Sequence, residues 1–388
     1  MVVSGVVCEY NPFHNGHRYM LDCMREDGTT HIIGIMSGNF VQRGDAAICD
    51  KYLRAENAVR NGVDLIIELP LPYAVGTAET FARGSVGLLD KLKCIDRLYF
   101  GSENGIDELR PCLEATETEE FAVRIKSYLD SGSSYPTAFS RAINNPVADK
   151  PNNILALEYM KQLKVLKSSI EPCAVLRMGV DHDSKEATGK FLSASAIRTG
   201  IRDGKCMALY MPDNAVESMK MVHLNGELPS DVKKIELAIL SKLRSMTAED
   251  LSEVADVNEG LEYRLEKAIS QATSIEELHN LVLTRRYTNA KIRRIFLCAF
   301  LGVTKEMQKE IPDYINVLAC NGKGIEIIKK IKENTDITVI TKHSESELLS
   351  TPDRMLYNFT DRCDDQFGLT LPEVRKCGYN REHRFEIM

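Results

Sequence analysis

The chain has 388 residues, more than one hydrophobic core usually supports, since single cores rarely grow beyond about 250–300 residues. Hydrophobic residues make up 44% and charged residues 27%, a composition that excludes an intrinsically disordered protein. The net charge of -7 argues against a surface that binds nucleic acid throughout, so any RNA site has to be a local basic patch.

The sequence also indicates a compartment. No run approaches the roughly 18–20 apolar residues of a membrane helix, and residues 1–7 are apolar but lack the basic leader of a signal peptide. The 11 cysteines are scattered, without a CxxC pair or zinc-ligand spacing, which is typical of reduced thiols. We therefore expect a cytoplasmic protein with no membrane association, and the sequence predicts no protein partner.

Short apolar runs rich in β-branched residues recur through the first two hundred residues, bounded by glycine, proline or polar loops. They predict strands that are buried on both faces, and amphipathic stretches between them predict helices. The predicted strands are Val2–Val7, His31–Met36, Val63–Leu69, Ile95–Phe100 and Cys173–Met178. The predicted helices are Gly16–Arg25, Lys51–Asn61 and Ala78–Lys93, with several more from Asp107 to Leu163.

Alternation of strands and helices predicts an α/β domain with a parallel sheet, whose ligand lies beyond the carboxyl ends of the strands near the topological switch point. After about Asp203 the pattern becomes mainly helical, so we place a domain boundary near residue 205, between residues 1–205 and 206–388. The later predicted helices are Asp231–Arg244, Gly260–Gln271, Ile275–Leu283, Asn289–Leu301 and Gly324–Lys332, the last flanked by predicted strands Tyr314–Ala319 and Ile337–Thr341.

The segment after the first predicted strand reads His14-Asn15-Gly16-His17 and opens the first helix. Gly16 leaves room for a phosphate, and the helix start offers unpaired amides and a partial positive charge. Both imidazoles can face one ligand and donate to a phosphate whose charge grows in the transition state, a donor being worth roughly 3–4 kcal/mol. The alternative is that His14 only caps the helix and His17 is a surface residue. The position after the first strand favours an ATP site with His14 and His17 as catalytic residues.

A second element, Phe191–Arg198, places the hydroxyls of Ser193 and Ser195 at a predicted helix N-terminus, with Arg198 at the same end. Hydroxyls, amides and a guanidinium there suit the β- and γ-phosphates of ATP and the leaving pyrophosphate. Alone, the segment is equally typical of a serine cap with a solvated arginine. Together with the histidine motif it favours phosphate binding by all three side chains.

Basic residues gather in one later segment of this acidic chain, at Arg285, Arg286, Lys291 and Arg294. Lys291 and Arg294 share a helix face, and Tyr287 offers a ring on which an unpaired base can stack. Such a patch gives salt-sensitive binding of RNA phosphates. We therefore expect Arg285, Arg286, Tyr287, Lys291 and Arg294 to bind tRNA. The alternative is a solvated helix face paired with acidic neighbours.

The histidine motif and the serine–arginine element together are the signature of the HxGH nucleotidyltransferase superfamily. Five further blocks resemble those of the tRNA(Met) cytidine acetate ligase family, and the resemblance covers nearly the whole chain. The blocks are Gly38–Gly44, Asn61–Pro70, Phe100–Glu103, Lys150–Leu155 and Arg285–Thr288.

The resemblance implies a Rossmann-like HUP nucleotidyltransferase domain, an ATP-binding catalytic part over residues 1–205 and a mainly helical tRNA-binding part over 206–388. It implies that ATP and acetate form acetyl-adenylate, and that N4 of the wobble cytidine of elongator tRNA(Met) then takes the acetyl group. Mg²⁺ would accompany ATP, without a dedicated carboxylate cage. The implied ATP contacts are Val7, Cys8, Glu9, Tyr10, Asn11, Pro12, Phe13, His14, Asn15, Gly16, His17, Arg18, Tyr19, Met20, Gly101, Asn152, Arg177 and Met178.

Two other functions use the same motif. A small-molecule adenylyltransferase of the pantetheine-phosphate or nicotinate-mononucleotide type would need the ATP loop but not the long helical second half. A non-catalytic RNA-binding protein with a relic nucleotide fold would not need both histidines, Gly16 and the Ser193–Arg198 element together. His182, which follows the Arg177 block, is more typical of a bystander than of a catalytic group.

Overall fold

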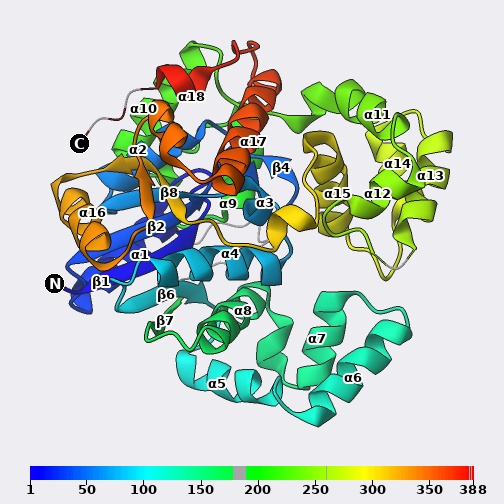
Figure 1. Cartoon of the computed structure of the whole chain (residues 1–388), viewed down its shortest axis with the longest axis horizontal. Coiled ribbons are helices and arrows are strands. Elements are labelled where there is room, and N and C mark those ends of the chain that lie inside the picture. The colour runs from blue at the N-terminus through cyan, green and yellow to red at the C-terminus, as the bar shows by residue number, and fades with distance from the viewer. Residues whose placement is uncertain (178–188, 259, 384, 386) are drawn as a thin grey trace.

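The computed structural model describes residues 1–177, 189–258, 260–383, 385 and 387–388. Its centre is a seven-stranded sheet in the order β7-β6-β1-β2-β5-β8-β9, with helices packed on both faces (Figure 1). The strands are β1 (Val3–Cys8), β2 (His31–Ser37), β5 (Leu65–Leu69), β6 (Arg97–Ser102), β7 (Glu171–Leu176), β8 (Tyr314–Cys320) and β9 (Thr338–Ile340). A two-stranded hairpin, β3 (Phe40–Val41) and β4 (Asp45–Ala46), comes after β2.

The five strands predicted in the first two hundred residues are confirmed, and all pair in parallel. Alternation along β2 explains their burial. Ile33 and Ile35 lie in the core cluster with α4, whereas Ile32 and Met36 lie in the cluster with α1 and α2. Successive strand residues point to opposite faces, so a strand covered on both sides needs an apolar residue at nearly every position.

The sheet extends past the predicted domain boundary. Strand β8 pairs antiparallel with β5, and β9 pairs in parallel with β8. The two later strands expected from the sequence therefore exist, but they belong to the same sheet as the first half. A boundary near residue 205 therefore leaves two strands of the sheet, β8 and β9, in the second half of the chain.

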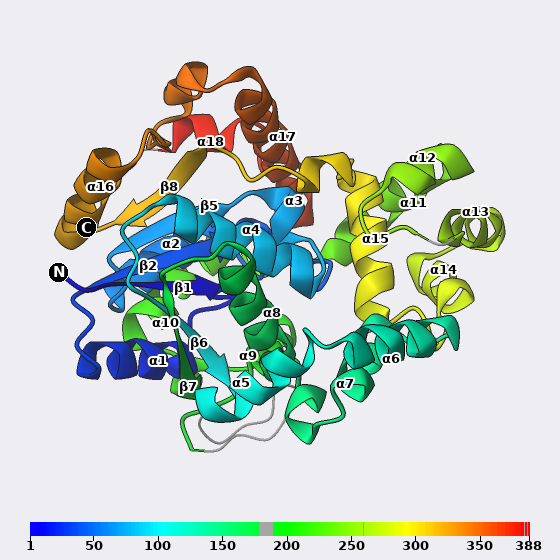
Figure 2. The same cartoon turned by 60° about the horizontal axis from the view of Figure 1, so that its bottom comes forward.

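The helices of the first half match the predicted ones closely. They are α1 (Asn15–Glu26), α2 (Lys51–Arg60), α3 (Leu71–Ala74), α4 (Ala78–Lys91), α5 (Ile106–Ala115), α6 (Glu119–Asp130), α7 (Tyr135–Ile143), α8 (Pro151–Val165) and α9 (Ala194–Arg202). Figure 2 shows α5 to α8 together on one side of the sheet. The largest core cluster contains residues of the sheet, α4 and α8.

The second half supplies a helical lobe and a return to the sheet. Its helices are α10 (Asp213–Leu224), α11 (Glu236–Arg244), α12 (Ala248–Glu253), α13 (Leu261–Gln271), α14 (Ile275–Val282), α15 (Asn289–Leu301), α16 (Gly322–Asn334), α17 (Thr351–Phe367) and α18 (Tyr379–Glu382). Helices α11 to α14 lie away from the sheet on the far side of α15 (Figures 1 and 2). They share a core cluster with α15 and with residues of α17.

Helix α17 is absent from the sequence-based elements, which left the last forty residues unassigned. Its polar residues explain this, because Thr360 and Asp361 are buried along with the apolar side chains of the helix and blur the amphipathic pattern. All eleven cysteines are free thiols. Among the residues that the structure describes, none of the helices combines the length and apolar character that a membrane span requires.

Candidate active site

The histidine motif lies at the carboxyl end of β1, between its two sheet neighbours. The chain runs from β1 to β2 and β5 on one side, and later places β6 on the other side. This reversal is the topological switch point of the sheet, where ligands of open α/β folds bind. The sheet therefore leaves a crevice at the place where the motif begins.

Each histidine of the motif uses its Nδ1 atom to accept a backbone hydrogen bond. His14 is the N-cap of α1, and its Nδ1 accepts from the Gly16 N–H at 3.0 Å. Nδ1 of His17 accepts from the His14 N–H at 3.2 Å. A neutral ring that accepts at Nδ1 carries its proton at Nε2, so both imidazoles have an Nε2–H donor. His14 thus is a helix cap, as the alternative interpretation held, and still keeps a donor for a ligand.

The two imidazoles stack, with ring centroids 3.6 Å apart and planes tilted by 20°. Burial, and then the positive charges of Arg177 and Arg198, lower the pKa of His14 to about 3. Burial, followed by His14 and Arg177, holds the pKa of His17 well below its ordinary value of 6.5. Two charged rings in contact would repel each other, so the stacked pair is neutral at pH 7.

Two aromatic residues of the loop hold the ring of His17. Tyr10 meets it edge-on at a centroid distance of 4.9 Å, and Phe13 lies at 5.5 Å. Both are buried, with 3% and 1% of their surface exposed. Tyr10 has a φ of 44°, in the left-handed region that side chains other than glycine rarely adopt. Such a conformation costs about 1–3 kcal/mol and persists only where the surroundings enforce it, as the packing of this loop does.

The second predicted element lies against the first. Ser193 caps α9, since its Oγ accepts from the Ala196 N–H at 3.2 Å, and the Ser193 and Ser195 hydroxyls lie 3.1 Å apart. Arg198 Nη1 donates to the Asn11 carbonyl oxygen at 2.8 Å, across 187 residues of sequence. The fold thus places the hydroxyls and the guanidinium beside the histidine loop.

These residues line one cleft of about 390 Å³, within the roughly 300–1,000 Å³ of small-molecule sites. The predicted contacts that line it are Val7, Cys8, Glu9, Tyr10, Asn11, His14, Gly16, His17, Tyr19, Met20, Gly101, Asn152, Arg177, Ser193, Ser195 and Arg198. They come from β1 and the loop that follows it, from α1, β6 and α8, from the end of β7, and from α9 with its N-cap, and the structure brings all of them together.

Other predicted ATP contacts do not line the cleft: Pro12, Phe13, Asn15 and Arg18. The side-chain amide of Asn15 donates to the Lys190 and Leu209 carbonyl oxygens, at 3.0 and 3.1 Å. Arg18 pairs with Asp22 at 2.9 Å on the exposed side of α1. Phe13 is a core residue instead. Met178 and His182 lie outside the described residues.

The cleft also contains residues that the sequence did not single out. Gln42 and Arg43 reach it from the β3–β4 hairpin, and Phe81 and Tyr159 from α4 and α8. The Gln42 N–H donates to Glu9 Oε1 at 3.1 Å, which ties the hairpin to the histidine loop. The block Gly38–Gly44 was a signal for the hairpin, whereas helix packing alone brings in the two aromatic rings.

The basic segment of the second half is only partly open. Asp256 pairs with Lys291 at 3.1 Å and with Arg294 at 2.7 Å, and the two cationic side chains are 18% and 13% exposed. Tyr287 is 9% exposed within the core of the helical lobe, with Lys291 Nζ 5.7 Å from its ring centroid. The expectation of an open stacking face at Tyr287 is therefore corrected, because the lobe buries the ring. Arg285 is exposed.

Known proteins share this sequence pattern and geometry. The sequence model of the family described as HIGH Nucleotidyl Transferase matches residues 1–381. The tRNA(Met) cytidine acetate ligase of Thermoanaerobacter sp. (strain X514) is 40% identical over 361 residues, which cover 89% of this chain and 90% of that protein. The one of Clostridium perfringens (strain ATCC 13124) is 36% identical over 403 residues, 97% of each chain.

Solved structures agree. Thermotoga maritima TmcAL in its apo form superposes with a TM-score of 0.92 at 28% identity, and the same protein bound with alpha-thio ATP with a TM-score of 0.88 at 29% identity. Each superposition covers 100% of both chains. The chain therefore belongs to the HIGH nucleotidyl transferase family and, within it, to the tRNA(Met) cytidine acetate ligases.

Proposed function

We propose that this protein is an ATP-dependent ligase that activates acetate as acetyl-adenylate and transfers the acetyl group to N4 of the wobble cytidine of elongator tRNA(Met). AMP and pyrophosphate are the other products. The observation that carries the proposal is the neutral, stacked pair of His14 and His17 in one cleft with Ser193, Ser195 and Arg198. We infer the substrates from the relatives that are named tRNA(Met) cytidine acetate ligase.

In the first step an acetate oxygen attacks the α-phosphorus of ATP, and the bond from that phosphorus to the bridging oxygen of pyrophosphate breaks. The Nε2–H groups of His14 and His17 donate to the α-phosphate oxygens, whose charge grows in the transition state. Ser193, Ser195 and Arg198 bind the β- and γ-phosphates and the departing pyrophosphate. Arg43, from the β3–β4 hairpin, adds a third guanidinium to those of Arg177 and Arg198 in the cleft.

Mg²⁺ belongs to this proposal as the counter-ion of ATP. Within the described ranges no three His, Cys, Asp or Glu side chains gather closely enough to hold a metal ion. Mg²⁺ usually binds through one or two carboxylates together with substrate phosphates, so the oxygens of ATP suffice to bring it. Glu9 lies in the cleft and is available as such a carboxylate.

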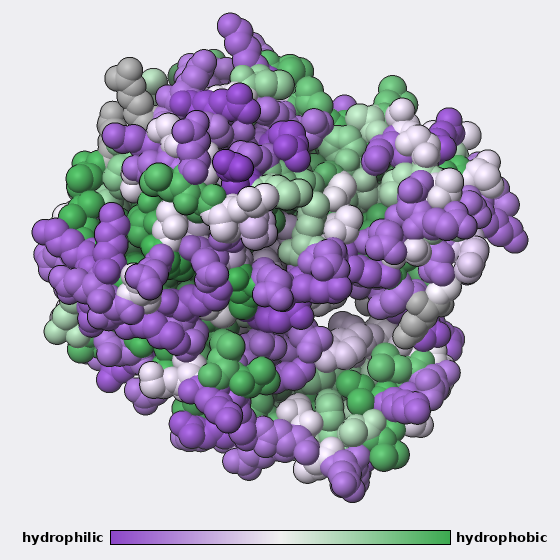
Figure 3. Space-filling model, in the orientation of Figure 1, coloured by the Kyte–Doolittle hydropathy of each residue, from purple (hydrophilic) through white to green (hydrophobic). Residues whose placement is uncertain are grey.

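In the second step the N4 amine attacks the acetyl carbonyl carbon, and the bond to the AMP oxygen breaks. The tRNA has to reach the cleft from outside. Figure 3 shows the molecular surface hollowed between the lobe of α11 to α15 and helices α6 and α7. We assign the anticodon arm to this hollow, with Arg285 and Arg286 binding its phosphates. Because tRNA is the acceptor, we expect the reaction to take place in the cytoplasm.

The test is transfer of labelled acetate to tRNA. With ATP and an elongator tRNA(Met) transcript, the protein should form N4-acetylcytidine at the wobble position with one AMP per acetyl group. A transcript with uridine at that position is the matched control and should take up no label. Activation of a phosphorylated metabolite in place of acetate would overturn the proposal in favour of a small-molecule adenylyltransferase. Acetylation undiminished in His17→Ala would remove the catalytic role of the histidine pair.

A further inference from the structure

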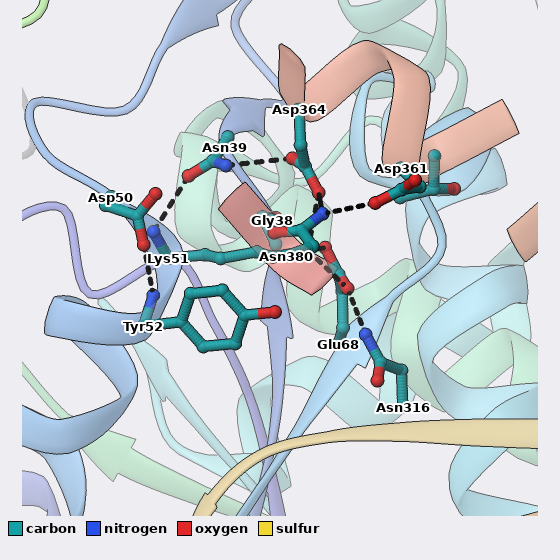
Figure 4. Close-up of polar contacts among 12 residues, drawn as sticks. Gly38, Asn39, Asp50, Lys51, Tyr52, Glu68, Asn316, Asp361, Asp364 and Asn380 are labelled. Carbon is teal, nitrogen blue, oxygen red and sulfur yellow. Dashed lines mark hydrogen bonds and ion pairs between the residues drawn. The ribbon is translucent and has the colours of Figure 1, made fainter. Parts of the chain in front are cut away.

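Three ionic side chains, from α2, β5 and α17, form a buried cluster. Lys51 Nζ, from α2, lies 2.8 Å from Glu68 Oε1 at the end of β5 and 2.6 Å from Asp364 Oδ2 on α17 (Figure 4). The side chains of Lys51, Glu68 and Asp364 are 1%, 3% and 9% exposed. Burial raises the pKa of Asp364 to about 6, against the opposing effect of Lys51.

A buried ion cluster is a poor source of stability. Moving each charge out of water costs several kcal/mol, and apolar residues of similar volume often do as well or better. In some proteins such a cluster fixes one arrangement of the chain. The groups that this cluster holds in place therefore indicate its role.

The cluster holds Asn39, the residue that leads into the β3–β4 hairpin. Asn39 Nδ2 donates to Asp364 Oδ1 at 2.8 Å, and Asn39 Oδ1 accepts from the Lys51 N–H at 2.8 Å. Both side-chain groups of a 2%-exposed asparagine are thus used, one by each helix. The two partners are separated by 313 residues of sequence but are joined by their own ion pair.

The preceding residue, Gly38, is fixed from two further sides. A Cβ at Gly38 would lie 2.4 Å from Glu68 Oε1, so no larger side chain fits against the carboxylate. The buried guanidinium of Arg54 donates to the Gly38 carbonyl oxygen and, at 2.6 Å, to the Glu9 carbonyl oxygen of the histidine loop. Elements α2, β5 and α17 therefore hold the turn at Gly38 and Asn39 from three directions.

The hairpin that begins after this turn is part of the cleft. Phe40 starts the hairpin, and Gln42 and Arg43 line the cleft beyond it. The hairpin backbone reaches the histidine loop through the bond from the Gln42 N–H to Glu9 Oε1. A shift of the turn would therefore move both side chains relative to the rest of the cleft.

We propose that Asp364 is a positioning residue for the adenylation step, acting through Asn39 on the hairpin that carries Gln42 and Arg43 into the ATP cleft. This inference rests on the proposed function of the cleft. It gives α17, which lies more than three hundred residues beyond the histidine motif, a defined part in the reaction. The competing explanation is that the cluster only fastens the C-terminal segment.

Helix α17 offers a matched control for that explanation. Asp365, the next residue, accepts from the Gly378 N–H at 2.7 Å and so fastens the same C-terminal segment. Asp364 also receives a bond from that segment, from Asn380 Nδ2 at 2.7 Å, but it alone of the two acidic neighbours bonds to Asn39. Asp365→Asn therefore loosens the segment without touching the turn.

The experiment measures kcat and KM for ATP in acetate-dependent ATP–pyrophosphate exchange, with the full chain. Asp364→Asn and Asn39→Ala should each lower kcat/KM by about ten- to a hundredfold, as expected for a displaced cleft residue. Asp365→Asn should stay within about twofold of the unaltered protein. In an Arg43→Ala background the Asp364→Asn change should add less than about twofold, because the guanidinium that the shifted hairpin would displace is already absent.

Two results would overturn the inference. One is that Asp364→Asn lowers kcat/KM by the same factor in the unaltered protein and in the Arg43→Ala background. The other is that Asp365→Asn lowers kcat/KM as much as Asp364→Asn does. If Asp364→Asn fails to fold, Asn39→Ala carries the test, since it leaves the three ionic side chains in place. If the unaltered protein shows no acetate-dependent exchange, the proposed function fails. The positioning role is then tested by calorimetry, which measures the ATP affinity of the same variants and compares them in the same pairs.

Discussion

Gly44 ends the loop of the β3–β4 hairpin and lies against α15. Its φ is 71°, and a Cβ there would lie 2.4 Å from the Arg294 backbone nitrogen and 2.6 Å from the Arg293 carbonyl carbon. Both contacts are to helix backbone, which cannot rotate away as a side chain can. Gly28 has a similar φ of 84° but nothing within 4 Å of its Cβ position. Gly44→Ala and Gly28→Ala thus share backbone strain and differ in the clash.

The structure gives the magnitude of each change. An alanine in the left-handed region costs about 1 kcal/mol relative to glycine, and this applies to both positions. Forcing a methyl group into a closed contact adds about 1–3 kcal/mol. We expect Gly28→Ala to lower the free energy of unfolding by about 1 kcal/mol and Gly44→Ala by about 2–4 kcal/mol.

Equilibrium unfolding in urea, followed by circular dichroism, measures both values under the same conditions. Gly44→Ala should also lower the rate of ATP–pyrophosphate exchange, because relief of the clash moves the hairpin that carries Arg43. Gly28→Ala should leave that rate unchanged, since Gly28 lies just after α1, at the opposite end of the helix from the histidines. Equal destabilisation by the two changes would refute the close approach of the hairpin to α15.

Three further predictions concern His14, Glu158 and the pair Arg285 and Arg286. Because the pKa of His14 is about 3, the free enzyme keeps this ring neutral above pH 5. The pH profile of kcat/KM for ATP should therefore show no change of slope near pH 6.5. A change of slope there that His14→Gln removes would contradict this. Burial raises the pKa of Glu158 from 4.5 to about 7, so the folded state binds this proton more tightly and loses stability as the pH rises through that window. Between pH 5 and pH 8 the free energy of unfolding of Glu158→Gln should therefore rise relative to that of the unaltered protein, by about 3 kcal/mol at most. Urea unfolding at each pH measures this difference, and a difference that does not change with pH would exclude the pKa shift. Arg285→Glu with Arg286→Glu should weaken tRNA binding in gel shifts and spare ATP affinity, and equal tRNA affinity at low salt would remove these residues from the RNA site.

Much of the α/β core could be predicted from the sequence alone. Strands such as His31–Ser37 are buried at every position, and their inner residues are apolar or glycine, because both faces of the sheet are covered. The histidine motif comes directly after one of these strands, so chain order alone puts it at the carboxyl edge of the sheet. Ser193 and Arg198 are 176 or more residues beyond His17, and only their suitability for phosphates connected the two elements.

Other features depend on tertiary contacts that leave no periodic signal. Helix α17 buries Asp361 and Thr360, so its apolar pattern is diluted where the ion cluster needs polar groups. Tyr287 was expected at the surface because its neighbours are basic. In the structure Lys291 pairs with Asp256, and its ammonium group lies against the ring of Tyr287. Strand β8 was predicted, whereas its antiparallel place beside β5 is set by the long return of the chain.

Acetate-dependent ATP–pyrophosphate exchange tests the central claim most directly, because it observes bond breaking at the α-phosphate without any tRNA. We predict exchange that rises with acetate and falls by about a hundredfold or more in His17→Ala, which removes an Nε2–H donor from the transition state. Exchange that is indifferent to acetate, or that persists undiminished without the imidazole of His17, would contradict the account.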